Sequence, residues 1–124
     1  MMHVLLDTHI FFWAVTDPDR LTVTQRDQIE SSINQIYVSA ISIAELMIKV
    51  SVGKLVLNFE PTQVAKDSGF ELLPYCDQAA LLLKDLPYIH RDPFDRMLVT
   101  QALHHQFFLM SNDALVRQYE CKLL

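Results

Sequence analysis

Four short apolar runs alternate with segments of helical periodicity, and this alternation limits the possible folds more than any other feature. The runs lie at residues 4–6, 36–39, 70–74 and 107–110. They are rich in Val, Leu, Ile and Phe, as expected of strands buried on both faces. Parallel strands need crossover connections, which the helices would supply. The sequence therefore predicts a three-layer α/β/α fold around a mainly parallel sheet of four or five strands, the fifth at 121–124.

Helix-start and helix-stop signals divide the segments between the strands. Thr22 or Thr24 is the expected N-cap of the second helix, and Asp77 that of the fifth. Gly53 is the expected residue just beyond the third helix. The expected helices cover residues 10–15, 21–33, 41–52, 61–67, 77–83 and 93–105.

Composition and length set further bounds. The chain of 124 residues is 51% hydrophobic, which suits one compact domain over 1–124. It has no apolar run near the ~20 residues that span a bilayer, and its N-terminus lacks the features of a signal peptide. Cys76 and Cys121 lack metal-site spacing, so we expect reduced thiols in a cytoplasmic protein without membrane contact. The net charge of −5 is unusual for a nucleic-acid binder unless several acids share bound cations.

The run from His90 to Arg96 is the most informative about function. Asp92 and Pro93 are the expected cap and first residue of the sixth helix. At 100° per residue, Asp95 falls near the centre of that helix's apolar stripe, and a carboxylate facing the core is costly unless a partner or a metal ion binds it. The stripe contains Leu98, Val99 and Ala102.

Three further acids occupy comparable positions. Asp7 and Asp113 follow the first and fourth strands, whose carboxyl ends should meet at one edge of the sheet. Glu45 lies inside the apolar stripe of the third helix. Local alternatives exist, since Asp7 could merely cap the next helix and Glu45 could pair with Lys49. One shared pocket explains all four acids at once. The stripe around Glu45 contains Ile41, Ala44, Ile48 and Val52.

Clustered carboxylates favour hard cations such as Mg²⁺ or Mn²⁺, and the natural reaction of such a site is phosphodiester hydrolysis. A nucleoside triphosphatase is not expected, because the chain has no Gly-rich phosphate loop. The five histidines show no ligand pattern. His9 and His90 are near enough to the acids to contact substrate, whereas His104 and His105 are expected at a helix end, where a cation suits the dipole.

At these residues the sequence resembles a PIN-domain ribonuclease, specifically a VapC-type toxin of a bacterial toxin–antitoxin pair. The family's acidic quartet corresponds to Asp7, Glu45, Asp95 and Asp113. Two positions depart from the family pattern: Ala44 stands where Trp is common, and Ser111 stands where Thr is frequent. The matching segments, in family order, are 5–9 with Trp13, 38–45, 48–49, 53–55, 90–96 with 101–102, and 111–113.

The resemblance implies Mg²⁺- or Mn²⁺-dependent cleavage of RNA, a homodimer, and a cognate antitoxin that inserts a segment near the active site. Asp7, Asp95 and Asp113 would hold the metal directly or through water, and Glu45 would orient metal or water. The remaining assignments are hydrogen-bond donors behind the acids, a helix cap and phosphate contacts. They are Thr8 and Ser111 as donors, Asp92 as the cap, and Arg91 and Arg96 on phosphate unless one of them pairs with Asp92.

Other functions remain open on the sequence alone. A receiver-like or aspartate-phosphatase domain also clusters acids, but a receiver needs a lysine at a later strand end, and none of the five lysines lies at the end of the fourth strand. A non-catalytic interaction domain would use the aromatic residues Phe11, Phe12 and Trp13, which belong either to the core or to a partner surface. A PIN nuclease acting in RNA processing without an antitoxin would keep the same chemistry.

Overall fold

A four-stranded, all-parallel sheet lies at the centre of the computed structural model, which describes all residues from 1 to 124. The strand order is β3-β2-β1-β4, with Leu5 of β1 opposite Tyr37 and Leu109. The predicted parallel sheet is confirmed, although the expected fifth strand is reduced to one bridge between Leu109 and Leu123. The strands are β1 (His3–Leu6), β2 (Gln35–Ser39), β3 (Glu71–Leu73) and β4 (Phe108–Met110).

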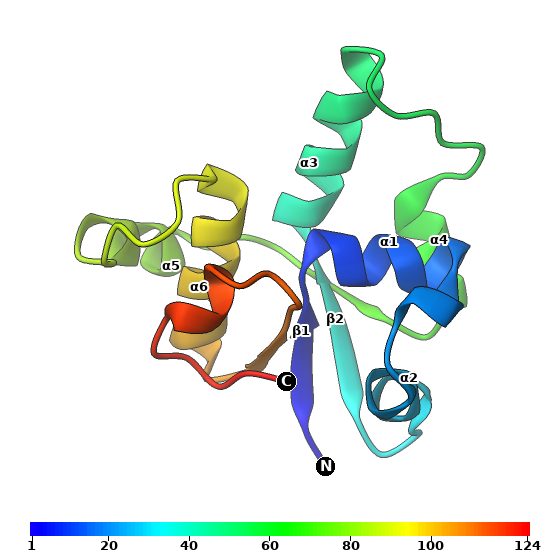
Figure 1. Ribbon diagram of the computed structural model, residues 1–124, viewed down its shortest axis with the longest axis horizontal. Helices are drawn as coiled ribbons and strands as arrows, with labels where there is room; N and C mark the ends of the chain where they lie inside the picture. Colours follow the sequence, from blue (N-terminus) through cyan, green and yellow to red (C-terminus); the bar gives the residue numbers. More distant parts are fainter.

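Helices cover both faces of the sheet (Figure 1). In this view α5 and α6 lie on one side of β1 and β2, and α1, α2 and α4 lie on the other, while α3 projects from the sheet. No helix has the length and apolarity to cross a membrane. The helices are α1 (Thr8–Thr16), α2 (Val23–Glu30), α3 (Ala40–Ser51), α4 (Pro61–Asp67), α5 (Asp77–Leu81) and α6 (Pro93–His105).

Most helix boundaries follow local signals. Thr22 caps α2 in a capping box with Gln25, and Gly53 follows α3 with φ +77°. Two expectations are wrong by a few residues. The second helix ends at Glu30 because Ser31 is already extended, and the N-cap of α5 is Cys76, which places Asp77 in the first turn.

Alternating strand side chains create two hydrophobic cores. Val4 and Leu6 of β1 pack with Phe11 of α1 in the larger core. Leu5 points to the opposite face and packs with Leu98 and the rest of the predicted α6 stripe. Because β1 is central and belongs to both cores, the residue that follows it is held in a defined place.

The prediction for the apolar face of α3 is wrong. Ile48 and Val52 are 49% and 61% exposed, and Ala44 is exposed as well. The buried side of α3 instead presents Glu45 and Leu46. The reason is that α3 extends beyond the sheet (Figure 1), so nothing in the chain covers its outer face.

Candidate active site

Asp7 lies directly after β1 and is buried, with only 3% of its surface exposed. Its carboxylate caps α1 by accepting a hydrogen bond from Ile10 N at 2.8 Å. The capping role weighed as an alternative is therefore present. Burial raises the pKa of Asp7, while hydrogen bonds from the Ser111 hydroxyl and from Ile10 N–H lower it and Asp113 raises it further. Asp7 thus caps α1 and also lies near a second acid, Asp113.

Asp95 lies in the first turn of α6, where its side chain is 15% exposed. Its Oδ2 is 2.9 Å from His90 Nε2. Burial raises the pKa of Asp95 to about 7, assisted first by the negative charge of Asp92 and also by those of Asp7 and Glu45. Burial is the largest of these causes, and the like charges of Asp92, Asp7 and Glu45 add to it because these carboxylates lie near Asp95.

Asp113 follows β4 and approaches the same point. Its Oδ1 lies 3.4 Å from His90 Nε2 and accepts hydrogen bonds from Leu115 N at 2.8 Å and Val116 N at 3.0 Å. Burial raises the pKa of Asp113, but these hydrogen bonds and His90 together lower it below its ordinary value. Asp113 therefore ionises more readily than Asp7 or Asp95, whose pKa values are raised.

Glu45 is 5% exposed and has two partners. The Thr8 hydroxyl donates to Glu45 Oε1 at 2.8 Å and also lies 3.0 Å from Ser42 Oγ. Lys49 Nζ is 3.1 Å from Glu45 Oε2, so the ion pair considered as an alternative exists. These contacts fix the carboxylate of Glu45 while leaving it near enough to Asp95 to affect its pKa.

The polar residues assigned around the acids have distinct surroundings. Asp92 caps α6, accepting from Phe94 N at 2.8 Å, as predicted. Ser111 is fully buried, and its Oγ accepts from Asp113 N at 3.1 Å. Neither Arg91 nor Arg96 forms an ion pair with Asp92, which corrects that alternative; the structure holds Asp92 on the helix terminus instead.

Arg96 is occupied by backbone and aromatic groups. Its Nη1 donates to Pro87 O at 3.0 Å and to Tyr119 Oη at 3.1 Å, and its guanidinium lies 4.8 Å from the centre of the Tyr88 ring. Arg96 thus ties the segment before α6 to the helix. Arg91 is exposed.

The sequence predicted that His90 lies near the acids, but it did not reveal which of them His90 contacts. Its Nδ1 accepts a hydrogen bond from Asp92 N at 3.1 Å, so Nδ1 carries no proton and Nε2 faces Asp95 and Asp113. The only signal was its position two residues before a helix cap. The fold turns that position into a bridge between two acids of different elements.

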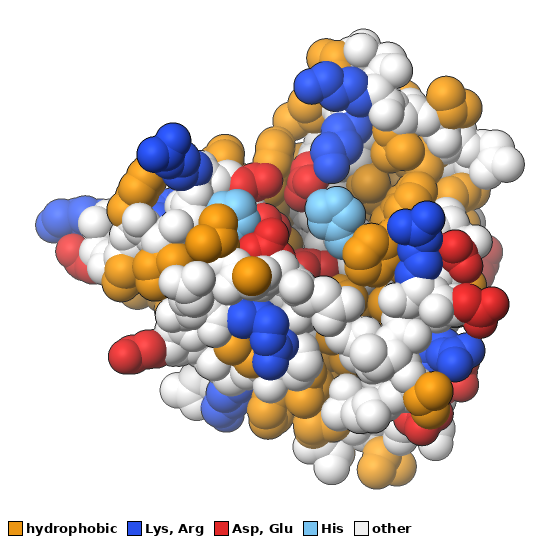
Figure 2. All heavy atoms as spheres, in the orientation of Figure 1, with side chains coloured by type: hydrophobic (Ala, Val, Ile, Leu, Met, Phe, Trp, Pro, Cys, Tyr) orange, Lys and Arg blue, Asp and Glu red, His pale blue; other side chains and the backbone are white.

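Figure 2 shows acidic side chains gathered in a hollow between the start of α6 and α3, with histidine side chains beside them and Lys or Arg side chains on α3. His90 Nε2 lies within 3.4 Å of both Asp95 and Asp113, and Asp7 and Glu45 are near enough to Asp95 to raise its pKa, so the structure brings these acids together. Burial is the main cause of the raised pKa values of Asp7 and Asp95, and repulsion from neighbouring acids raises both further. A divalent cation would relieve that repulsion, and oxygen donors without thiolates suit Mg²⁺ or Mn²⁺.

The sequence matches the PIN domain family over residues 4–120, nearly its whole length. The chain belongs to the PIN domain family. PIN domains are typically metal-dependent nucleases, a class for which the oxygen donors of this hollow are suited. No curated protein matches the sequence.

Solved PIN-domain structures share the fold at low sequence identity. VapBC2 from Rickettsia felis bound to promoter DNA aligns with a TM-score of 0.76 and 17% identity, covering 99% of this chain and 98% of the other. DNA-bound VapBC from Salmonella typhimurium aligns with a TM-score of 0.70 and 18% identity, covering 100% of this chain and 98% of the other. FitAcB from Neisseria gonorrhoeae aligns with a TM-score of 0.61 and 18% identity, covering 98% of this chain and 96% of the other. The PIN domain resembles these in fold.

The aromatic run of α1 is divided between core and surface. Phe11 is fully buried in the larger core. Phe12 and Trp13 are half-buried and line a groove of about 400 Å³ between α1 and α3, whose other side includes Lys49 and Lys54. The groove adjoins the acids, because Thr8 contributes to both.

Proposed function

We propose that this PIN domain is a metal-dependent endoribonuclease and the toxin of a toxin–antitoxin pair. The observation that carries the proposal is the convergence of Asp7, Asp95 and Asp113, from β1, α6 and β4, on one hollow with Glu45 beside it. The domain extends over residues 1–124 and acts in the cytoplasm. Its substrate is an RNA phosphodiester bond.

Within this proposal, the chain's residues divide the work by their surroundings. Asp7, Asp95 and Asp113 would hold Mg²⁺ or Mn²⁺, which when bound supplies an activated water and neutralises charge on phosphorus. Glu45, fixed by Thr8 and Lys49, orients the water or the ion.

The surrounding polar residues support the acids. Ser111 donates to Asp7, and Asp92 holds the helix terminus that carries Asp95. Of the two arginines assigned to phosphate, Arg91 is the more available, since Arg96 already binds Pro87 O and Tyr119 Oη.

Partners enter the proposal through two surfaces. The groove lined by Phe12 and Trp13 would receive an antitoxin segment, and the exposed apolar residues on the outer face of α3 would contribute to a homodimer or a larger toxin–antitoxin assembly. The similarity in fold to the VapBC and FitAcB structures supports this assignment.

The test is cleavage of total cellular RNA by the purified protein with Mg²⁺, Mn²⁺ or EDTA, beside Asp7→Asn and Asp95→Asn. We expect discrete fragments that require metal and disappear in both variants. Asp77→Asn, which alters an exposed aspartate of α5, is the matched control and should cleave normally.

Two outcomes would contradict the nuclease. Full activity in Asp7→Asn or Asp95→Asn would remove these acids from the reaction. No cleavage under any condition, with every antitoxin removed, would favour the interaction domain. If cleavage occurs but no antitoxin gene lies beside this one, an RNA-processing nuclease replaces the toxin.

A further inference from the structure

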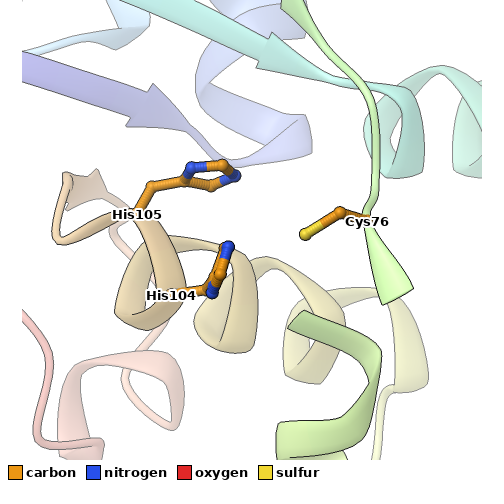
Figure 3. A group of neighbouring side chains, drawn as sticks. All are labelled: Cys76, His104 and His105. Atoms are coloured by element: carbon orange, nitrogen blue, oxygen red, sulfur yellow. The ribbon is translucent and has the colours of Figure 1, made fainter. Parts of the chain in front are cut away.

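A second group of metal-binding side chains lies at the opposite end of α6 from Asp95. Cys76, from the segment between β3 and α5, faces His104 and His105 in the last turn of α6 (Figure 3). The Cys76 sulfur and one nitrogen of each imidazole ring all lie within 4.8 Å of one another. His104 follows Asp95 by nine residues, about 14 Å along a helix axis, so this group is separate from the acidic hollow.

No spacing in the sequence predicts this group. The two cysteines are far apart in the chain, and neighbouring histidines on a helix do not form the usual ligand spacing. The fold brings Cys76 to the end of α6 because the chain after β3 runs along that helix. Gln101 Nε2 donates to Pro74 O at 3.1 Å, and Tyr75 Oη lies 2.8 Å from Thr100 Oγ1.

The polar atoms of the group have no competing protein partners. His105 Nε2 is buried without a hydrogen bond, a costly state for a polar atom. The His105 ring stacks on Phe107 with 5.1 Å between ring centres, which limits its orientation. Burial, followed by the neighbouring His104, lowers the pKa of His105, and the neutral ring is the form that binds metals.

We propose that Cys76, His104 and His105 form a zinc site, with water in the fourth position. One thiolate and two imidazoles are a ligand set that suits Zn²⁺, whereas Mg²⁺ prefers the oxygen donors of the acidic hollow. In a tetrahedral zinc site the ligand atoms lie about 3.5 Å from one another. Side-chain rotations that move these atoms by about 1 Å would therefore complete the site. All three residues are half-buried, and an ion can reach them from solvent.

Such a site would tie the segment before α5 to the end of α6. Zinc would then stabilise the native protein, because the unfolded chain does not hold the three ligands together. The proposal does not depend on nuclease activity, since none of its ligands belongs to the acidic hollow.

The test uses Co²⁺ as a spectroscopic substitute for Zn²⁺ on the metal-free, reduced full chain. We expect one equivalent of Co²⁺ to produce a thiolate-to-cobalt charge-transfer band, which Zn²⁺ removes and Mg²⁺ does not. The band should be lost in Cys76→Ser. In His105→Gln the apparent affinity for Co²⁺, measured from the band, should fall at least tenfold. Zinc at 100 times its Kd should raise Tm by about 5–10 °C in the native protein but not in Cys76→Ser.

Cys121→Ser is the matched control, because Cys121 is the other free cysteine and is also half-buried. It should keep both the charge-transfer band and the zinc-dependent rise in Tm, as should Asp95→Asn. Cys121→Ser also decides the matter if Cys76→Ser fails to fold, since any remaining thiolate band must then come from Cys76. Absence of the band in the native protein, or its loss in Cys121→Ser, would overturn the proposal.

Discussion

At the scale of single residues, Asp95 shows how a functional position conflicts with stability. Its pKa moves from an ordinary 3.8 to about 7, chiefly through burial and through the charge of Asp92. The unfolded chain releases this proton near pH 3.8, but the folded chain keeps it until about pH 7. Between these values the unfolded state binds fewer protons, so folding stability falls as pH rises. Asp113 behaves oppositely, since its pKa is lowered in the fold.

Asp95→Asn should therefore stabilise the metal-free protein above pH 7. Removing the buried charge should add about 2–4 kcal/mol to the free energy of unfolding at pH 8 and almost nothing at pH 4. Urea unfolding in EDTA across this range would measure the effect.

Asp113→Asn is the opposing control. It should lower stability at pH 8, because a charged acceptor of the Leu115 and Val116 N–H groups is lost. A stability curve for Asp95→Asn parallel to that of the native protein at every pH would contradict the assignment.

At the scale of elements, α6 connects the helix cap to the site. Asp92 accepts hydrogen bonds from Phe94 N at 2.8 Å and Asp95 N at 3.4 Å, and its charge is the second cause of the raised Asp95 pKa. One carboxylate thus stabilises the helix and tunes the acid one turn further on.

Two substitutions separate these effects. Asp92→Ala should destabilise the protein by about 1 kcal/mol in urea unfolding at pH 5, where Asp95 is protonated and only the cap is lost. Asp92→Asn keeps the cap and should cost only a few tenths of a kcal/mol at that pH. In both variants the pKa of Asp95, followed by NMR, should fall, and an unchanged value would show that Asp92 does not act on Asp95.

At the scale of the whole molecule, α1 lies between the larger core and the groove. Phe11 is fully buried, whereas Phe12 and Trp13 line the groove shared with α3. The same helix therefore presents one aromatic ring to the core and two to the groove, and the effects of substituting them should differ in kind.

If the proposed antitoxin segment occupies this groove, Trp13→Ala should weaken its binding at least tenfold and cost less stability than Phe11→Ala. The core substitution should cost about 3–5 kcal/mol in urea unfolding, since it leaves a cavity in a packed interior. Titration calorimetry would measure the antitoxin affinity of Trp13→Ala beside that of the native protein. Unchanged affinity in Trp13→Ala would place the partner elsewhere.

Features that depend on nearby residues could be predicted from the sequence. The cap at Thr22, the helix stop at Gly53 and the Asp92-Pro93 start of α6 each depend on contacts within about one turn. The parallel sheet followed from alternating apolar runs, which also placed Asp7 and Asp113 at the carboxyl ends of strands. The structure added that these two strands, β1 and β4, are neighbours.

Only the tertiary structure decided which side chains from distant segments meet. It placed His90 between Asp95 and Asp113, left the outer face of α3 exposed at Ile48, and brought Cys76 to the end of α6. The physical reason is that periodicity and capping depend on neighbours along the chain, whereas these meetings depend on how far an element extends past the sheet and on the path of the loops that connect it.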